Sequence, residues 1–117
     1  MKDADCITLG FELENNELTR SKARIGLCRV WTRDAIEVAK KFRFDHSLIF
    51  SLEAREVDPE PGFSHTFLRV LAEGLENYVF DGTGTGSHSP FFGKEADAPH
   101  LQDSHLDLIH YYLLNDE

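Results

Sequence analysis

The chain has 117 residues, and its 41% of hydrophobic residues fall in periodic segments, which is typical of one globular domain rather than of a disordered chain. A formal net charge of -9 opposes nucleic-acid binding, and no apolar run approaches the roughly 20 residues that a membrane-spanning helix needs. The first residues lack the pattern of a secretory signal, so we expect a cytoplasmic protein with a single domain over residues 1–117.

Two segments of alternating polarity open the chain. Residues 7–14 and residues 20–31 each place apolar side chains at every second position, a spacing typical of half-buried strands. The polar residues 15–19 between them predict a loop that joins the two strands. We therefore expect an antiparallel hairpin at the beginning of the chain.

Charge favours one register for this hairpin. Pairing Glu12 with Lys22 joins opposite charges across the strands and leaves a second such pair beside the loop. A register shifted by two residues is the alternative, and it keeps only one charge pair. The favoured register sets Cys6 opposite Cys28 on the exposed face, where we expect both thiols to be reduced in a cytoplasmic protein.

The middle of the chain predicts a helix, a strand and a second helix. Residues 32–43 carry apolar side chains at helical spacing, with basic residues near the end that favour the helix dipole. Residues 47–55 alternate like a half-buried strand, which the Pro-rich residues 58–62 should end. Residues 64–78 again show helical spacing.

The last third of the chain begins with a glycine-rich segment. Residues 81–86 read Asp-Gly-Thr-Gly-Thr-Gly, and such glycines can turn backbone N–H groups towards an anion. The segment lacks the lysine and the strand-to-helix context of nucleotide-binding loops, so we expect residues 81–100 to form a flexible loop. Phe91 and Phe92 should hold its middle against the domain, and residues 103–114 predict a final helix.

These elements predict an α+β fold, namely a two-layer sandwich. A small, mainly antiparallel sheet of at least three strands should be covered on one face by about three helices. The helix over residues 32–43 could connect its flanking strands as one parallel pair. The other face of the sheet should be exposed and charged.

Catalytic candidates are few in the sequence. His65 and His88 could act as general acid and base in a small hydrolase or phosphotransfer enzyme whose site is the loop over residues 81–100. Cys28 lies among arginines that could lower its pKa, but no partnering base is visible near it, which favours a thiol in the core. The histidine and cysteine spacings match no zinc motif, so we expect neither a metal nor another cofactor.

Charge distribution favours a non-enzymatic binding protein over this enzyme. Residues 20–43 carry eight basic and two acidic side chains, whereas residues 71–117 carry nine acidic side chains and one lysine. An acidic surface would steer association with a protein that has a basic surface, as in an inhibitor, an immunity-type protein or an accessory protein. The expected contacts are three charges and three aromatic anchors: Asp97, Asp103, Asp107, Phe91, Phe92 and Tyr111. The oligomeric state stays open.

Overall fold

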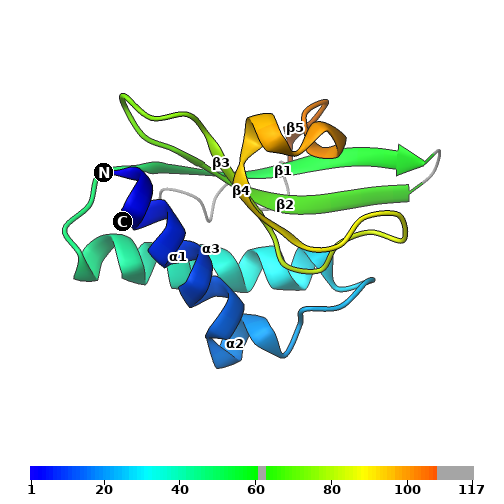
Figure 1. The fold of residues 1–117 in the computed structure, drawn as a ribbon. Coiled ribbons are helices and arrows are strands. Elements are labelled where there is room, and N and C mark those ends of the chain that lie inside the picture. The colour runs from blue at the N-terminus through cyan, green and yellow to red at the C-terminus, as the bar shows by residue number, and fades with distance from the viewer. Residues whose placement is uncertain (61–62, 108–117) are drawn as a thin grey trace.

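One antiparallel sheet with helices packed against it organises the computed structural model, which describes residues 1–60 and 63–107 (Figure 1). The helices are α1 (Asp3–Asn15), α2 (Glu17–Arg20) and α3 (Cys28–Asp45). The strands are β1 (Ser51–Glu60), β2 (Phe63–Leu71), β3 (Tyr78–Asp81), β4 (Phe91–Lys94) and β5 (His105–Leu106), with short 3-10 turns η1 (Glu95–Asp97) and η2 (Pro99–Leu101). The strand order is β4-β3-β2-β1-β5. The predicted α+β class, with helices on one face of a mainly antiparallel sheet, is confirmed.

The hairpin expected at the beginning of the chain is wrong, because residues 3–15 form helix α1. Alternating apolar residues also contain pairs four positions apart, and such pairs share one side of a helix. Leu9 and Leu13 are buried in this way, while Ile7 and Phe11 point away from the core and are exposed. Cys6 is therefore a buried residue of α1 and does not pair with Cys28 across a hairpin.

Helix α3 confirms the helix predicted over residues 32–43 and extends it backwards to Cys28. Its buried face includes Trp31, Ala35 and Ala39, which lie in the core between the helices and the sheet. The strand expected over residues 20–31 is wrong, because α2, a series of turns and the first residues of α3 occupy that range. Gly26 adopts a φ of 95° in the last of these turns, a conformation that favours glycine.

Strands β1 and β2 form the long central hairpin of the sheet. The strand predicted over residues 47–55 is confirmed from Ser51 onward, where β1 begins; residues 47–50 precede it, and β1 continues to Glu60, past the start of the Pro-rich segment that was expected to end it. The helix predicted over residues 64–78 is wrong, because β2 pairs with β1 in antiparallel register, for example Ala54 with Leu68. Both faces of β2 are buried, so its apolar residues run continuously and lose the alternation that identifies a strand. The expected parallel pair is absent from the described sheet, where every pairing is antiparallel.

A second, smaller core covers part of the sheet face opposite the helices. Phe67 and Val79 from the strands pack there with Ala98 and Leu101 from the η1–η2 segment, which lies on that side of the sheet in Figure 1. The expectation that this face is exposed and charged is therefore wrong for the part that this second core covers.

The expected loop over residues 81–100 is likewise more ordered than expected, because it contains β4 and the two 3-10 turns. Phe91 and Phe92 are half-buried, as predicted. The described start of the predicted last helix contains β5, and the remainder of that prediction, including Tyr111, lies outside the described residues.

Within residues 1–60 and 63–107, no helix combines the length and apolar character needed to cross a bilayer.

Candidate active site

Three residues from different elements meet to form a thiol, imidazole and carboxylate series. Cys28 is the first residue of α3, His65 lies near the start of β2, and Asp81 ends β3. The Nε2 atom of His65 lies 2.8 Å from Oδ2 of Asp81, and the Cys28 thiol lies near enough to the His65 ring for the two groups to shift each other's pKa. Because Nε2 faces the carboxylate, Nδ1 is the ring nitrogen left for the thiol. This is the connectivity of a nucleophile, its base and the group that orients the base.

The three residues differ in burial: His65 and Asp81 are buried, whereas Cys28 is half-buried. The side chains of His65 and Asp81 are only 2% and 1% exposed. Cys28 is half-buried and lines an open cavity of about 240 Å³, together with His65. The cavity therefore gives access from solvent to Cys28, whereas the side chains of His65 and Asp81 are almost completely buried.

The surroundings of Cys28 favour its thiolate form. Burial alone would raise the pKa of the thiol, but the hydrogen bond with His65 and the backbone N–H groups of Thr66 and Arg29 outweigh it and lower the pKa below its usual value. The position of Cys28 at the beginning of an 18-residue helix adds the favourable end of the helix dipole. Cys28 thus has the features of a reactive cysteine.

His65 shows the complementary change. Burial opposes its charged form, yet the hydrogen bonds to Asp81 and Cys28 prevail and raise the pKa of His65 to about 9. The two shifts act in the same direction, because a lower pKa of Cys28 and a higher pKa of His65 both favour the ion pair of a thiolate and an imidazolium.

The glycine-rich segment after β3 holds Asp81 in place. Oδ1 of Asp81 accepts hydrogen bonds from the backbone N–H groups of Thr83, at 3.2 Å, and Gly84, at 3.0 Å. Oδ2 is left for His65. The N–H groups that the sequence analysis considered for a phosphate therefore bind a carboxylate of the protein itself.

Gly82 permits this loop to pass over the core. A Cβ atom at this position would lie 1.9 Å from Cε2 of Trp31, which is buried on α3 one turn after Cys28. Only a residue without a side chain fits there, so Gly82 links the position of Asp81 to that of α3.

Replacing Gly82 by alanine should therefore lower the free energy of unfolding by about 3 kcal/mol, because the buried indole has no room to move. The matched control is Gly86→Ala, because a Cβ at Gly86 meets no atom within 4 Å. That variant should stay within about 0.5 kcal/mol of the parent. Urea denaturation of both variants measures the difference, and equal midpoints would contradict the contact.

His88, the other histidine named from sequence, lies outside this series. Its ring stacks on His100 with centroids 4.0 Å apart and planes 3° apart. Burial and the neighbouring His88 lower the pKa of His100. The structure therefore uses only one of the two predicted catalytic histidines, His65, beside the thiol.

The acidic residues proposed for binding do not form one surface. Asp97 and Asp103 are exposed, as expected. Asp107 is only 3% exposed, and its Oδ2 accepts a hydrogen bond of 3.4 Å from the hydroxyl of Thr66, so its assignment to an exposed acidic surface is wrong. Asp107 directly follows β5, which pairs with β1, and its backbone N–H donates a hydrogen bond to the carbonyl of Ala54, which holds it against the sheet.

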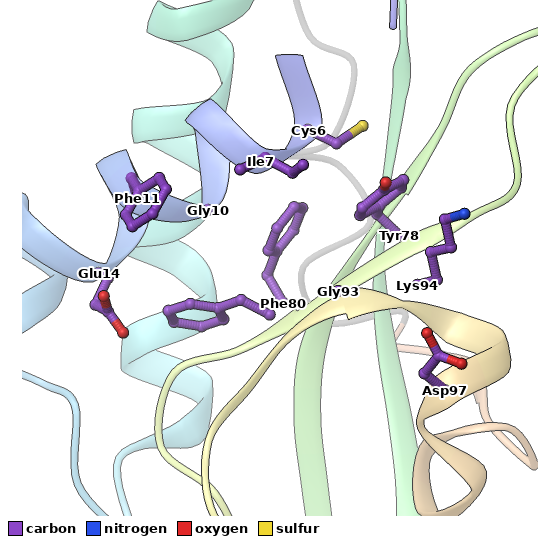
Figure 2. Close-up of a pocket in the computed structure, with 11 residues that line it drawn as sticks. Cys6, Ile7, Gly10, Phe11, Glu14, Tyr78, Phe80, Gly93, Lys94 and Asp97 are labelled. Atoms are coloured by element: carbon purple, nitrogen blue, oxygen red, sulfur yellow. The ribbon is translucent and has the colours of Figure 1, made fainter. Parts of the chain in front are cut away.

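Figure 2 shows a second cavity, a groove of about 470 Å³ between α1 and the β3–β4 edge of the sheet. Its lining includes Ile7 and Phe11 of α1, Phe92 of β4 and Asp97 of η1. Cys6 also lies here, and burial together with the nearby carboxylates of Asp3 and Asp5 raises its pKa to about 11. The raised pKa favours the neutral thiol of Cys6, in contrast to the lowered pKa of Cys28.

Two members of the candidate site were missed or set aside from sequence. Asp81 was read as part of a loop, although an acidic residue directly after the apolar run Tyr78-Val79-Phe80 and before Gly-Thr-Gly signals a buried, orienting carboxylate. The sequence favours a core thiol for Cys28, because its base is remote in sequence.

Among the described residues, no group of three or more histidine, cysteine, aspartate or glutamate side chains has an arrangement that could hold a metal ion.

Comparison of the chain with protein-family models, with curated proteins and with solved structures finds no match. Its function must therefore be inferred from the geometry around Cys28.

Proposed function

We propose that this protein is a cysteine-dependent hydrolase or acyltransferase that acts on an ester, thioester or amide through an acyl-enzyme on Cys28. The observation that carries the proposal is the series of Cys28, His65 and Asp81, in which His65 is bonded to Asp81 and lowers the pKa of Cys28, a residue that lines an open cavity. Such series recur on unrelated folds and are recognised by geometry and roles rather than by sequence position.

The reaction would proceed in two halves. The thiolate of Cys28 attacks the carbonyl carbon, a C–S bond forms, and the carbonyl electron pair moves to oxygen. His65 then donates its proton to the leaving group as the bond to that group breaks. In the second half, water or another nucleophile gives its proton to His65, attacks the acyl carbon and releases the thiolate.

The beginning of α3 supplies the electrostatic support for this reaction. The first N–H groups of a helix have no acceptor within the helix, and they point outward from its end. The backbone N–H of Cys28 is the first of these, because α3 begins at this residue. In the proposed reaction this N–H group donates to the oxyanion that develops beside the thiol.

Acylation of the protein by p-nitrophenyl acetate tests the proposal. An acetyl group should be found by mass spectrometry on the peptide that contains Cys28, and not on the peptide that contains Cys6. Absence of that adduct, together with no Cys28-dependent turnover of esters, thioesters or amides, would contradict it.

The pH dependence of kcat/KM should be bell-shaped, because the reactive form needs a thiolate and an imidazolium together. Activity should rise with pH as Cys28 loses its proton, below the usual range of a cysteine. It should fall again as His65 deprotonates near pH 9, since the folded-state pKa of His65 is raised to about 9. Initial rates between pH 5 and pH 10.5 measure both limbs. A pH profile that only rises towards high pH would contradict the ion pair between the Cys28 thiolate and the His65 imidazolium.

The groove of Figure 2 favours a second candidate function, the docking of a protein with a basic surface. Phe92 and Asp97, two of the residues predicted for binding, both line it, together with the exposed residues Ile7 and Phe11. For a partner captured by the native protein, association should slow at higher salt and in the variant Asp97→Lys. An association rate indifferent to both changes would contradict docking at this groove.

A further inference from the structure

Apolar side chains surround the Cys28 thiol on its solvent side. The cavity beside the thiol is lined by Ile25, from the turn before α3, Val30, from the first turn of α3, and Phe63, from the start of β2. Ile25 is 59% exposed and Phe63 is 46% exposed. Single exposed apolar residues are common on protein surfaces, but these converge on a hollow that contains a reactive thiol and its base.

The described residues that line the cavity offer no unpaired charge that could bind a charged group of a substrate. Among the described residues that line it none is acidic, so they offer no partner to a basic substrate group. Arg29 is the one lysine or arginine among these described lining residues, and its guanidinium is 3.0 Å from the carboxylate of Glu56. The remaining polar side chain besides the catalytic residues is the hydroxyl of Ser64. The lining therefore complements an uncharged, apolar group.

We propose that the acyl part of the substrate carries a bulky apolar side chain, such as that of leucine, which lies between Ile25 and Phe63. This inference rests on the proposed function, because it concerns the group that Cys28 would hold as its acyl-enzyme. Burying such a side chain in an apolar pocket discriminates against a substrate that lacks it by about 10-fold or more. Ile25 and Phe63 are the specificity-determining residues, and neither is needed for the chemistry at the thiol.

Alkylation by chloromethyl ketones provides a test that does not depend on turnover. N-acetyl-leucyl and N-acetyl-glycyl chloromethyl ketone both form a C–S bond with the Cys28 thiolate and release chloride, but only the first offers an apolar side chain. The leucyl reagent should alkylate Cys28 at least about 10-fold faster than the glycyl reagent. In Phe63→Ala and in Ile25→Ala this ratio should fall by at least about 3-fold, whereas the rate with iodoacetamide should be unchanged.

Two exposed apolar residues elsewhere give matched controls. Phe44 and Ile49 are even more exposed than Phe63 and Ile25, and neither lines the cavity at Cys28. Phe44→Ala and Ile49→Ala should retain the leucyl preference of the parent. A ratio near one in the parent, or a ratio that survives both cavity variants, would overturn the inference.

The outcomes separate this inference from the proposed function. Cys28-dependent ester turnover without a leucyl preference would contradict the apolar subsite but support the proposed enzymatic function. A leucyl preference that depends on Phe63 and Ile25, without turnover of any ester, thioester or amide, would remove the enzyme and leave an apolar site beside a reactive thiol.

Discussion

Replacing Cys28 by alanine should reduce kcat/KM for hydrolysis of p-nitrophenyl acetate by at least about 1000-fold, because the acyl-enzyme can no longer form. The fold should survive, since Cys28 is half-buried at the beginning of α3 and alanine is a good helix former. Initial rates and mass spectrometry of the acylated protein measure the loss.

Cys6→Ala is the matched control for this variant. Its thiol has a pKa raised to about 11 and lies in the groove between α1 and the sheet, away from His65. Cys6→Ala should therefore keep the activity of the parent per folded molecule, with the folded fraction measured by circular dichroism. A Cys28→Ala variant that retained more than about a tenth of the parent activity would exclude Cys28 as the nucleophile.

The second large effect is expected from Asp81→Asn, which removes one charge and almost no volume. Oδ1 of Asp81 accepts from the N–H groups of Thr83 and Gly84, so an asparagine must place its oxygen there. Its NH2 group then faces Nε2 of His65 and donates to it, which puts the single proton of the neutral ring on Nδ1, towards the thiol. His65 can no longer accept a proton from that side, and we expect kcat to fall by about 1000-fold.

The pH profile distinguishes this positioning role from a merely structural one. Asp81 is the first of the groups that raise the pKa of His65, so in Asp81→Asn the alkaline limb of kcat/KM should move to lower pH. Asp103→Asn is the control, because Asp103 is exposed and should leave rate and limb unchanged. A slow Asp81→Asn variant whose alkaline limb stayed near pH 9 would show that Asp81 does not act through His65.

The candidate site could be predicted only in part, because its members come from three elements. His65 was named as a catalytic candidate, and Cys28 was weighed and set aside for lack of a base. That base is supplied by β2, which the chain reaches only after α3 and β1. Asp81 carried a local signal, namely an acidic residue between a buried apolar run and a glycine-rich turn, but its partner could be identified only from the β2–β3 pairing.

Features that depend on local physics can be predicted from the amino-acid sequence alone. The α+β class, the helix over residues 32–43 and the strand over residues 47–55 follow from an apolar stripe or an alternation that fits one element type, and each was confirmed. The half-burial of Phe91 and Phe92 follows likewise from the free energy of removing aromatic surface from water.

The secondary-structure types of α1 and β2 depend instead on long-range packing. The spacing of Leu9 and Leu13 fits a strand and a helix equally well, and the burial of both faces of β2 erases its alternation. The packing of α1 on the sheet and the pairing of β2 with its two neighbours resolve these ambiguities, and the same pairing brings His65 to Asp81. The reactivity of Cys28 is decided there too, because its pKa is set by groups that are distant in sequence and adjacent only in the folded chain.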